Sequence, residues 1–144
     1  ELQALVAASL LHDIGKLVLA QSMPDTYAEV LRKTGTGFAA TAEQELLLTT
    51  HADVGAYLLG LWGLTDAVVE AVAFHEHPGA APTEALGLPA IVHAADRLAR
   101  FPDQADPCSG QLRLDTRCLE QFNMSERWPI WQSAWARHLA GGEK

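Results

Sequence analysis

Histidines beside acidic residues are the features of this sequence best suited to chemistry. They occur in four short segments: LLHDIGK with His12 and Asp13, THADVGAYLL with His51, FHEHP with His75 and Glu76, and VHAADRLA with Asp96. A buried imidazole or carboxylate is costly unless something pairs with it. Imidazole and carboxylate together suit iron, manganese or zinc better than an ion that prefers thiolates. The four segments therefore predict a divalent metal site.

Each of these residues lies at or beside the end of an apolar helical pattern. His51 precedes Val54 by three residues, and Asp96 follows Val92 by four, so each shares a helix face with apolar neighbours. We therefore expect the side chains to converge on one pocket: His12, Asp13, His51, His75 and Asp96.

Other interpretations of the same polar residues remain open. Asp96 is equally suited to a salt bridge with Arg97 or Arg100 on its own helix. His93 either supports a ligand from behind or packs a helix face, and His77, beside a proline at a helix end, is expected at the surface. For any single histidine, a hydrogen-bonded core or surface role is the commoner one.

Helical periodicity of the apolar residues runs through the sequence, whereas alternating strand patterns bounded by turns are absent. The fold class is therefore all-α. Gly15 marks a bend or an end in the first helix, and Gly63 caps a later one. The predicted helices are Leu2–Leu19, Pro24–Arg32, Thr41–Trp62 with a break near Thr49 and Thr50, a helix from Thr65 or Asp66 to Pro78, Pro89–Arg100, Asp115–Phe122 and Ser125–Leu139.

Apolar stripes on two of these helices are predicted to face the core. Leu2 and Val6 belong to the stripe of the first helix. Tyr57, Leu61 and Trp62 belong to that of the helix that contains His51.

The charge of the chain limits its partners. The 144 residues carry 18 acidic and 10 basic side chains, a formal charge of −8, and no basic block. Nucleic acid gains its affinity from clustered Lys and Arg, so it is excluded as a partner. A small molecule that contains phosphate remains compatible, because a bound metal ion supplies positive charge. Lys16, three residues after Asp13, is a candidate donor to such a phosphate; the alternative is an ordinary exposed lysine.

The composition also favours a cytoplasmic protein. The longest apolar stretch without a charge, Val54 to Leu64, is too short for a membrane span, which needs about 20 residues. Asp13 and Lys16 interrupt the apolar N-terminal segment, so no signal peptide is visible. The two cysteines, neither in a CxxC pair, fit a reducing compartment.

The same segments resemble a known superfamily. LLHDIGKLVL is similar to the signature of the HD superfamily, whose founding members are metal-dependent phosphohydrolases. EQELLLTTHADVGAYLLGLWGLTDAVVEAVAFHEHP resembles the HDOD subgroup, and more distantly the HD-GYP cyclic diguanylate phosphodiesterases. IVHAADRLA matches a later helix where the family keeps an aspartate. The resemblance covers Glu1 to Arg100 and implies a compact HD-type bundle of about six helices.

The resemblance also implies roles for individual residues. His12 and Asp13 match the central metal-ligand pair and Asp96 the last ligand. His51 and His75 match histidines that hold a second metal in HD-GYP relatives, and Lys16 a lysine that faces phosphate. Glu76 stands where HD-GYP proteins have a second histidine, but its carboxylate is still a metal ligand by type. The family's first histidine ligand has no counterpart, and nothing after Pro78 resembles the Gly-Tyr-Pro loop.

The resemblance favours a bacterial signal-transduction output domain of the HDOD type, with a complete or vestigial metal site. Its expected partner is another protein or an upstream receiver domain. The alternatives are a metal-dependent phosphohydrolase acting on a nucleotide or cyclic dinucleotide, and an iron-based gas sensor. We expect residues 1–144 to form a single domain, as a C-terminal fragment without an upstream helix or receiver domain. Such a fragment should bind metal weakly or not at all and have little phosphodiesterase activity.

Overall fold

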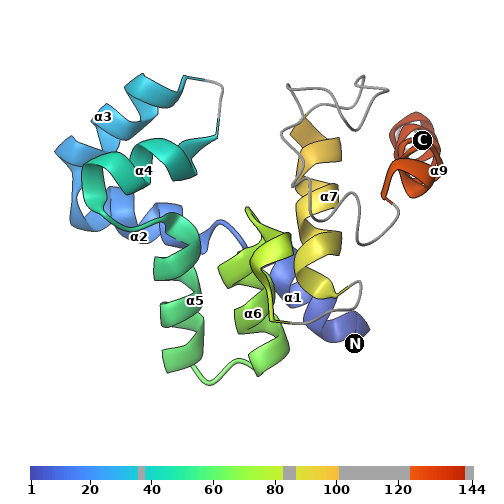
Figure 1. The fold of residues 1–144 in the computed structure, drawn as a ribbon, viewed down its shortest axis with the longest axis horizontal. Helices are drawn as coiled ribbons and strands as arrows, with labels where there is room; N and C mark the ends of the chain where they lie inside the picture. Colours follow the sequence, from blue (N-terminus) through green and yellow to red (C-terminus); the bar gives the residue numbers. More distant parts are fainter. Residues whose placement is uncertain (36–37, 83–86, 101–123, 142–144) are drawn as a thin grey trace.

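All regular elements in the described part of the chain are helical, which confirms the predicted all-α class (Figure 1). The computed structural model describes residues 1–35, 38–82, 87–100 and 124–141. The helices are α1 (Leu2–Leu11), α2 (Ile14–Ser22), α3 (Pro24–Thr34), α4 (Ala39–Leu47), α5 (His51–Leu61), α6 (Asp66–Phe74), the 3-10 turn η1 (Pro78–Ala80), α7 (Leu88–Arg100) and α9 (Met124–Gly141).

Two apolar clusters hold these helices together. In one, α1 packs against α6 and α7 around Leu59 and Val72; in the other, α3 pairs with α4 around Tyr27 and Val30. Helices α2 and α5 pack against each other and reach both clusters. The residues at the N-terminal ends of α2 and α5 therefore lie between the clusters, where a polar site can be enclosed.

Most predicted boundaries are found, with one shift that matters for the site. The predicted break near Thr49 and Thr50 separates α4 from α5, and Gly63 has the positive φ of 77° expected of a helix end. The first helix, however, is interrupted at His12 and Asp13 rather than at Gly15. The break itself thus presents two predicted ligands. The predicted helix Asp115–Phe122 lies outside the described residues.

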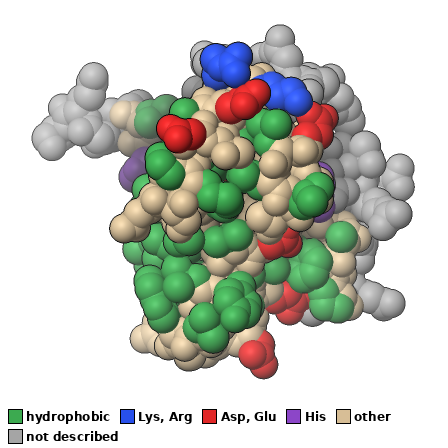
Figure 2. Space-filling view, turned by 90° about the vertical axis from the view of Figure 1, so that its left-hand side faces the viewer, with side chains coloured by type: hydrophobic (Ala, Val, Ile, Leu, Met, Phe, Trp, Pro, Cys, Tyr) green, Lys and Arg blue, Asp and Glu red, His purple; other side chains and the backbone are tan. Residues whose placement is uncertain are grey.

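The predicted apolar stripes were wrong at their outer positions. Tyr57, Leu61 and Trp62 are exposed by 71%, 68% and 61%, and Leu2 and Val6 are also exposed. The opposite face of α5 is buried instead, because its small residues let α2 and α6 approach closely. Figure 2, which views the molecule from the left of Figure 1, shows many hydrophobic side chains at the surface.

One stretch of the described chain, Leu2–Ser22, is apolar and long enough to cross a membrane. The sequence pattern predicts no span, because charges interrupt each apolar run. Only 17% of the most apolar window is buried, and the stretch forms two helices separated at His12 and Asp13. Length and composition near an N-terminus are weak evidence for a span, and a signal sequence passes the same test.

Gly15 sets the distance between α2 and α5. A Cβ atom added there would lie 1.9 Å from the backbone oxygen of His51. Gly15→Ala should therefore lower the free energy of unfolding by about 3 kcal/mol, because a packed interface must open to admit the methyl group. Urea denaturation would measure the change. Gly60→Ala in α5 is the control: its Cβ meets nothing within 4 Å, so the variant should be at least as stable as the wild type. Equal stability of the two variants would contradict the close contact.

Candidate metal centre

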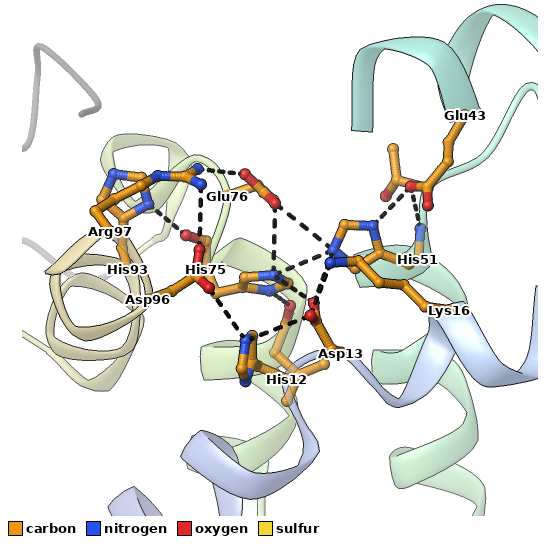
Figure 3. A network of polar contacts seen from close by, with 12 residues as sticks. His12, Asp13, Lys16, Glu43, His51, His75, Glu76, His93, Asp96 and Arg97 are labelled. Carbon is orange, nitrogen blue, oxygen red and sulfur yellow. Dashed lines mark hydrogen bonds and ion pairs between the residues drawn. The ribbon is translucent and has the colours of Figure 1, made fainter. Parts of the chain in front are cut away.

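The structure brings together the side chains that the sequence predicted to converge (Figure 3). His12 and Asp13 lie in the turn between α1 and α2, and His51 is the first residue of α5. His75 and Glu76 follow directly after α6, and Asp96 lies on α7. Four segments that are distant in the sequence thus contribute to one polar cluster, and the predicted convergence is found.

Asp13, His51 and His75 form the tightest group. One ligand atom from each lies within 4.8 Å of the others. His51 Nε2 lies 3.4 Å from Asp13 Oδ1, and His75 Nε2 lies 3.8 Å from the same oxygen. Both histidines are buried. Glu76 Oε1 is 3.7 Å from His51 Nε2 and 3.9 Å from His75 Nε2, at the edge of this group.

His12 and Asp96 lie on the other side of Asp13. His12 Nε2 is 3.7 Å from Asp13 Oδ2 and 3.7 Å from Asp96 Oδ1. Burial alone would lower the pKa of His12, but Asp96 and Asp13 outweigh that effect and raise it. The carboxylates here therefore favour positive charge, whether a proton on His12 or a metal ion.

Hydrogen bonds at the rear of the rings fix which nitrogen faces the cluster. His51 Nδ1–H donates to Glu43 Oε2 at 2.7 Å, and His75 Nδ1–H donates to the carbonyl of Val72 at 2.8 Å. Carboxylate and carbonyl oxygens only accept, so the neutral rings carry their proton on Nδ1. In both rings the lone pair on Nε2 faces the cluster, as a metal ligand requires.

The chemistry of these donors fits a metal ion. The two Nε2 atoms lie 3.2 Å apart, and lone pairs so close repel unless a proton or a metal cation is shared between them. Two nitrogens bound to one zinc-like ion at about 2.1 Å with tetrahedral geometry would lie about 3.4 Å apart, close to this spacing. Asp13 Oδ1 and His12 Nε2 are buried without a hydrogen-bond partner, and such orphaned atoms call for an explanation. A divalent cation beside Asp13 Oδ1 would account for the spacing of the two Nε2 atoms and for the orphaned oxygen.

Three basic side chains lie against the carboxylates of the cluster. Lys16 Nζ donates to Asp13 Oδ2 at 2.7 Å, at the edge of the cluster. Arg100 Nε donates to Asp96 Oδ1 at 2.8 Å, and Arg100 Nη2 lies 3.6 Å from Asp13 Oδ2. Burial would raise the pKa of Asp96, but His12 and Arg100 together lower it well below its ordinary value.

Arg97 is the buried member of the basic group. It donates to Glu76 and, at 3.2 Å, to Asp96 Oδ2, while its guanidinium lies 3.7 Å from the centre of the Phe38 ring. The salt bridges that the sequence offered as the alternative for Asp96 are therefore present, alongside its contact with His12. The structure thus places Asp96 with the basic residues as well as with the predicted ligands.

Sequence reasoning assigned no role to several residues that support the site. Glu43, on α4, is fully buried and contacts His51, and Tyr27 donates to Glu43. His93, also buried, donates to the carbonyl of His75 at 2.6 Å, which agrees with the supporting role left open for it. His77 is exposed, as predicted. The only feature of the sequence that could have indicated a role for Glu43 is its position eight residues before His51.

The buried imidazole of His75 should make the metal-free protein sensitive to acid. Burial lowers its pKa to about 4, and the nearby His51 and His12 add to this, against the opposing effects of Val72 and Glu76. Between pH 6.5 and 4, the unfolded chain binds a proton that the folded protein excludes, so stability falls as pH falls.

The loss should reach about 2 to 3 kcal/mol by pH 4.5. The pKa of His12 is raised in the folded protein, so protonation of His12 stabilises the fold as pH falls and opposes the effect of His75. We therefore expect the effect in the difference between wild type and His75→Gln, measured by urea denaturation with a chelator at pH 7 and pH 4.5. A difference that does not change with pH would argue against a buried neutral His75.

The comparisons with known proteins agree with this geometry. Residues 1–78, more than half of the chain, match the model of the HDOD domain. The chain therefore belongs to the HDOD family, within the HD superfamily that its motifs resemble. It is also 28% identical over 111 residues to an uncharacterized protein of Treponema pallidum (strain Nichols). That match covers 73% of this chain but only 22% of the relative's length. No solved structure matches.

Proposed function

We propose that this chain is a signal-transduction output domain of the HDOD type whose Asp13–His51–His75 cluster binds a divalent metal ion. The observation that carries the metal site is the pair of Nε2 lone pairs, 3.2 Å apart and facing the Asp13 carboxylate. Imidazole and carboxylate ligands suit iron, manganese or zinc. Membership of the HDOD family supports the signalling role, and a protein partner or an adjoining receiver domain is part of this proposal.

The ligand atoms divide into two groups around Asp13. Oδ1 of Asp13 and the Nε2 atoms of His51 and His75 form the stronger group, with Glu76 as the next carboxylate. His12 and Asp96 form the weaker one, because both oxygens of Asp96 already accept from guanidinium groups. The stronger group needs no upstream histidine. We therefore propose that this chain binds one ion by itself, more tightly than its motifs alone predict.

A second candidate function is a metal-dependent phosphohydrolase, and Lys16 is the observation that favours it. Its ammonium group lies 2.7 Å from Asp13 Oδ2 and is partly exposed. With a cation on Asp13 Oδ1, Lys16 would be placed to hold a phosphate oxygen, with Arg100 nearby as a second positive group. The metal would supply a polarised phosphoryl oxygen and an activated water.

Metal analysis combined with turnover assays separates the two candidates. The chain would be stripped with a chelator, then titrated calorimetrically with Zn²⁺, Mn²⁺ and anaerobic Fe²⁺. The loaded protein would then be tested on bis(p-nitrophenyl) phosphate and a cyclic dinucleotide. One ion per chain without turnover is the expected result and supports the signalling role. Turnover that is lost in Asp13→Asn would establish the phosphohydrolase. No binding of any of these ions would overturn the proposed metal site.

A further inference from the structure

The Glu43 carboxylate is a fully buried charge that no predicted role explains. It lies on α4, outside the four segments that carry the candidate ligands. Its Oε1 accepts a hydrogen bond from Tyr27 Oη at 3.0 Å, and its Oε2 accepts from the backbone N–H of His51 at 2.8 Å and from Nδ1 of the same ring at 2.7 Å. A charge buried at this cost requires such partners.

His51 differs from the other two histidines in what holds its ring. His12 and His75 donate from Nδ1 to backbone carbonyls of Ser9 and Val72, each three residues earlier in the chain. His51 alone among these three donates to a charged side chain, and that side chain comes from another helix. A carboxylate behind an imidazole fixes its tautomer and raises the basicity of the opposite nitrogen.

We propose that Glu43 is the positioning residue of His51. It holds the ring with Nε2 directed at Asp13 and His75, and its charge strengthens Nε2 as a metal ligand. The backbone hydrogen bond to the same carboxylate anchors the first turn of α5, so ring and helix are held by one group. Tyr27 fixes the second carboxylate oxygen and thereby ties α3 to the arrangement. This inference rests on the proposed metal site, except for the tautomer of His51, which exists without metal.

The decisive variant is Glu43→Gln, which keeps the size and an accepting oxygen but removes the charge. Calorimetric titration of the chelator-stripped protein with Zn²⁺ should show an affinity about 10- to 100-fold weaker than the wild type. Glu45→Gln, on the same helix but with an exposed side chain paired to Lys33, is the matched control and should bind like the wild type. Tyr27→Phe, which keeps the charge of Glu43 and both of its hydrogen bonds to His51, should weaken binding less than Glu43→Gln does.

A second readout separates this inference from the metal proposal. Nitrogen-15 NMR of the histidine rings in the metal-free wild type reports which nitrogen carries the proton. The expected result is a proton on Nδ1 of His51 in the wild type and a mixture of tautomers in Glu43→Gln. If no ion binds at all, the proposed metal site fails while this measurement still tests Glu43. Protonation of His51 on Nε2 in the wild type would overturn the inference. So would a Glu43→Gln variant that folds, as judged by its circular dichroism and melting temperature, with unchanged tautomer and Zn²⁺ affinity.

Discussion

Replacing Arg97 with methionine should lower the free energy of unfolding of the metal-free protein by about 3 to 5 kcal/mol. Arg97 is only 2% exposed and holds two acidic side chains, Glu76 and Asp96. Burial would raise the pKa of Glu76, but the charge of Arg97 lowers it. Without Arg97, Glu76 is a buried carboxylate without its principal partner. Guanidinium chloride denaturation at pH 7 with a chelator would measure the loss.

Arg32→Met is the matched control for this prediction. Arg32 is 77% exposed and its contact with Glu29 at 3.4 Å is a surface ion pair, so its loss should cost less than about 0.5 kcal/mol. The double variant Arg97→Met with Glu76→Leu should recover most of the lost stability, because it removes both charges of the buried pair. Equal small effects of Arg97→Met and Arg32→Met would show that the buried ion pairs do not hold the site together.

Asp13→Asn should weaken metal binding by more than about 100-fold, beyond the range expected for groups that only support ligands. Asp13 is the sole carboxylate in the group with His51 and His75, and both imidazoles face its Oδ1 atom. Burial would raise the pKa of Asp13, but Lys16, His12 and His51 lower it, so it is charged and ready to bind at neutral pH. The amide that replaces it has no charge to offer a cation.

Calorimetric titration and thermal unfolding would both report the loss. An ion at 100 times its dissociation constant stabilises a folded protein by about 2.7 kcal/mol, so the wild type should melt at a higher temperature with metal and the variant should not. Asp25→Asn, at an exposed position in the first turn of α3, should retain the full shift. If Asp13→Asn binds metal as tightly as the wild type, the ion does not bind at the Asp13–His51–His75 group.

The ligands could be predicted from sequence because each stands at the end of an apolar pattern. The His12–Asp13 motif, His51 and His75 needed only local spacing and a compact bundle to converge. Glu43 could not be predicted in this way, because an acidic residue in the middle of a helix more commonly faces water. Its burial follows from the turn that folds α4 back over the start of α5.

The interior face of α5 was the other part that sequence could not settle. Large apolar side chains occupy one side of this helix, whereas the other side carries glycine and alanine with one large apolar residue, Leu59. Periodicity favours the large side chains as the core, yet Gly55 and Ala56 are buried and Tyr57 is exposed. The close approach of the α2 and α5 backbones explains why the small residues are the buried ones. Gly15 fits against the carbonyl of His51 only because neither helix places a large side chain at this contact. Gly15 and His51 are 36 residues apart in the sequence, so this contact between helices produces no pattern within α5 from which it could be predicted.

The ring protons of His51 and His75 have a consequence for the kinetics of metal uptake. Both rings already carry their proton on the nitrogen that faces away from the cluster, so an arriving ion displaces no proton from either of them. Thiolate sites behave differently, because their ligands lose protons near pH 8.5 and load faster as the solution becomes more alkaline. The rate at which these two histidines take up an ion should therefore vary little between pH 7 and 8.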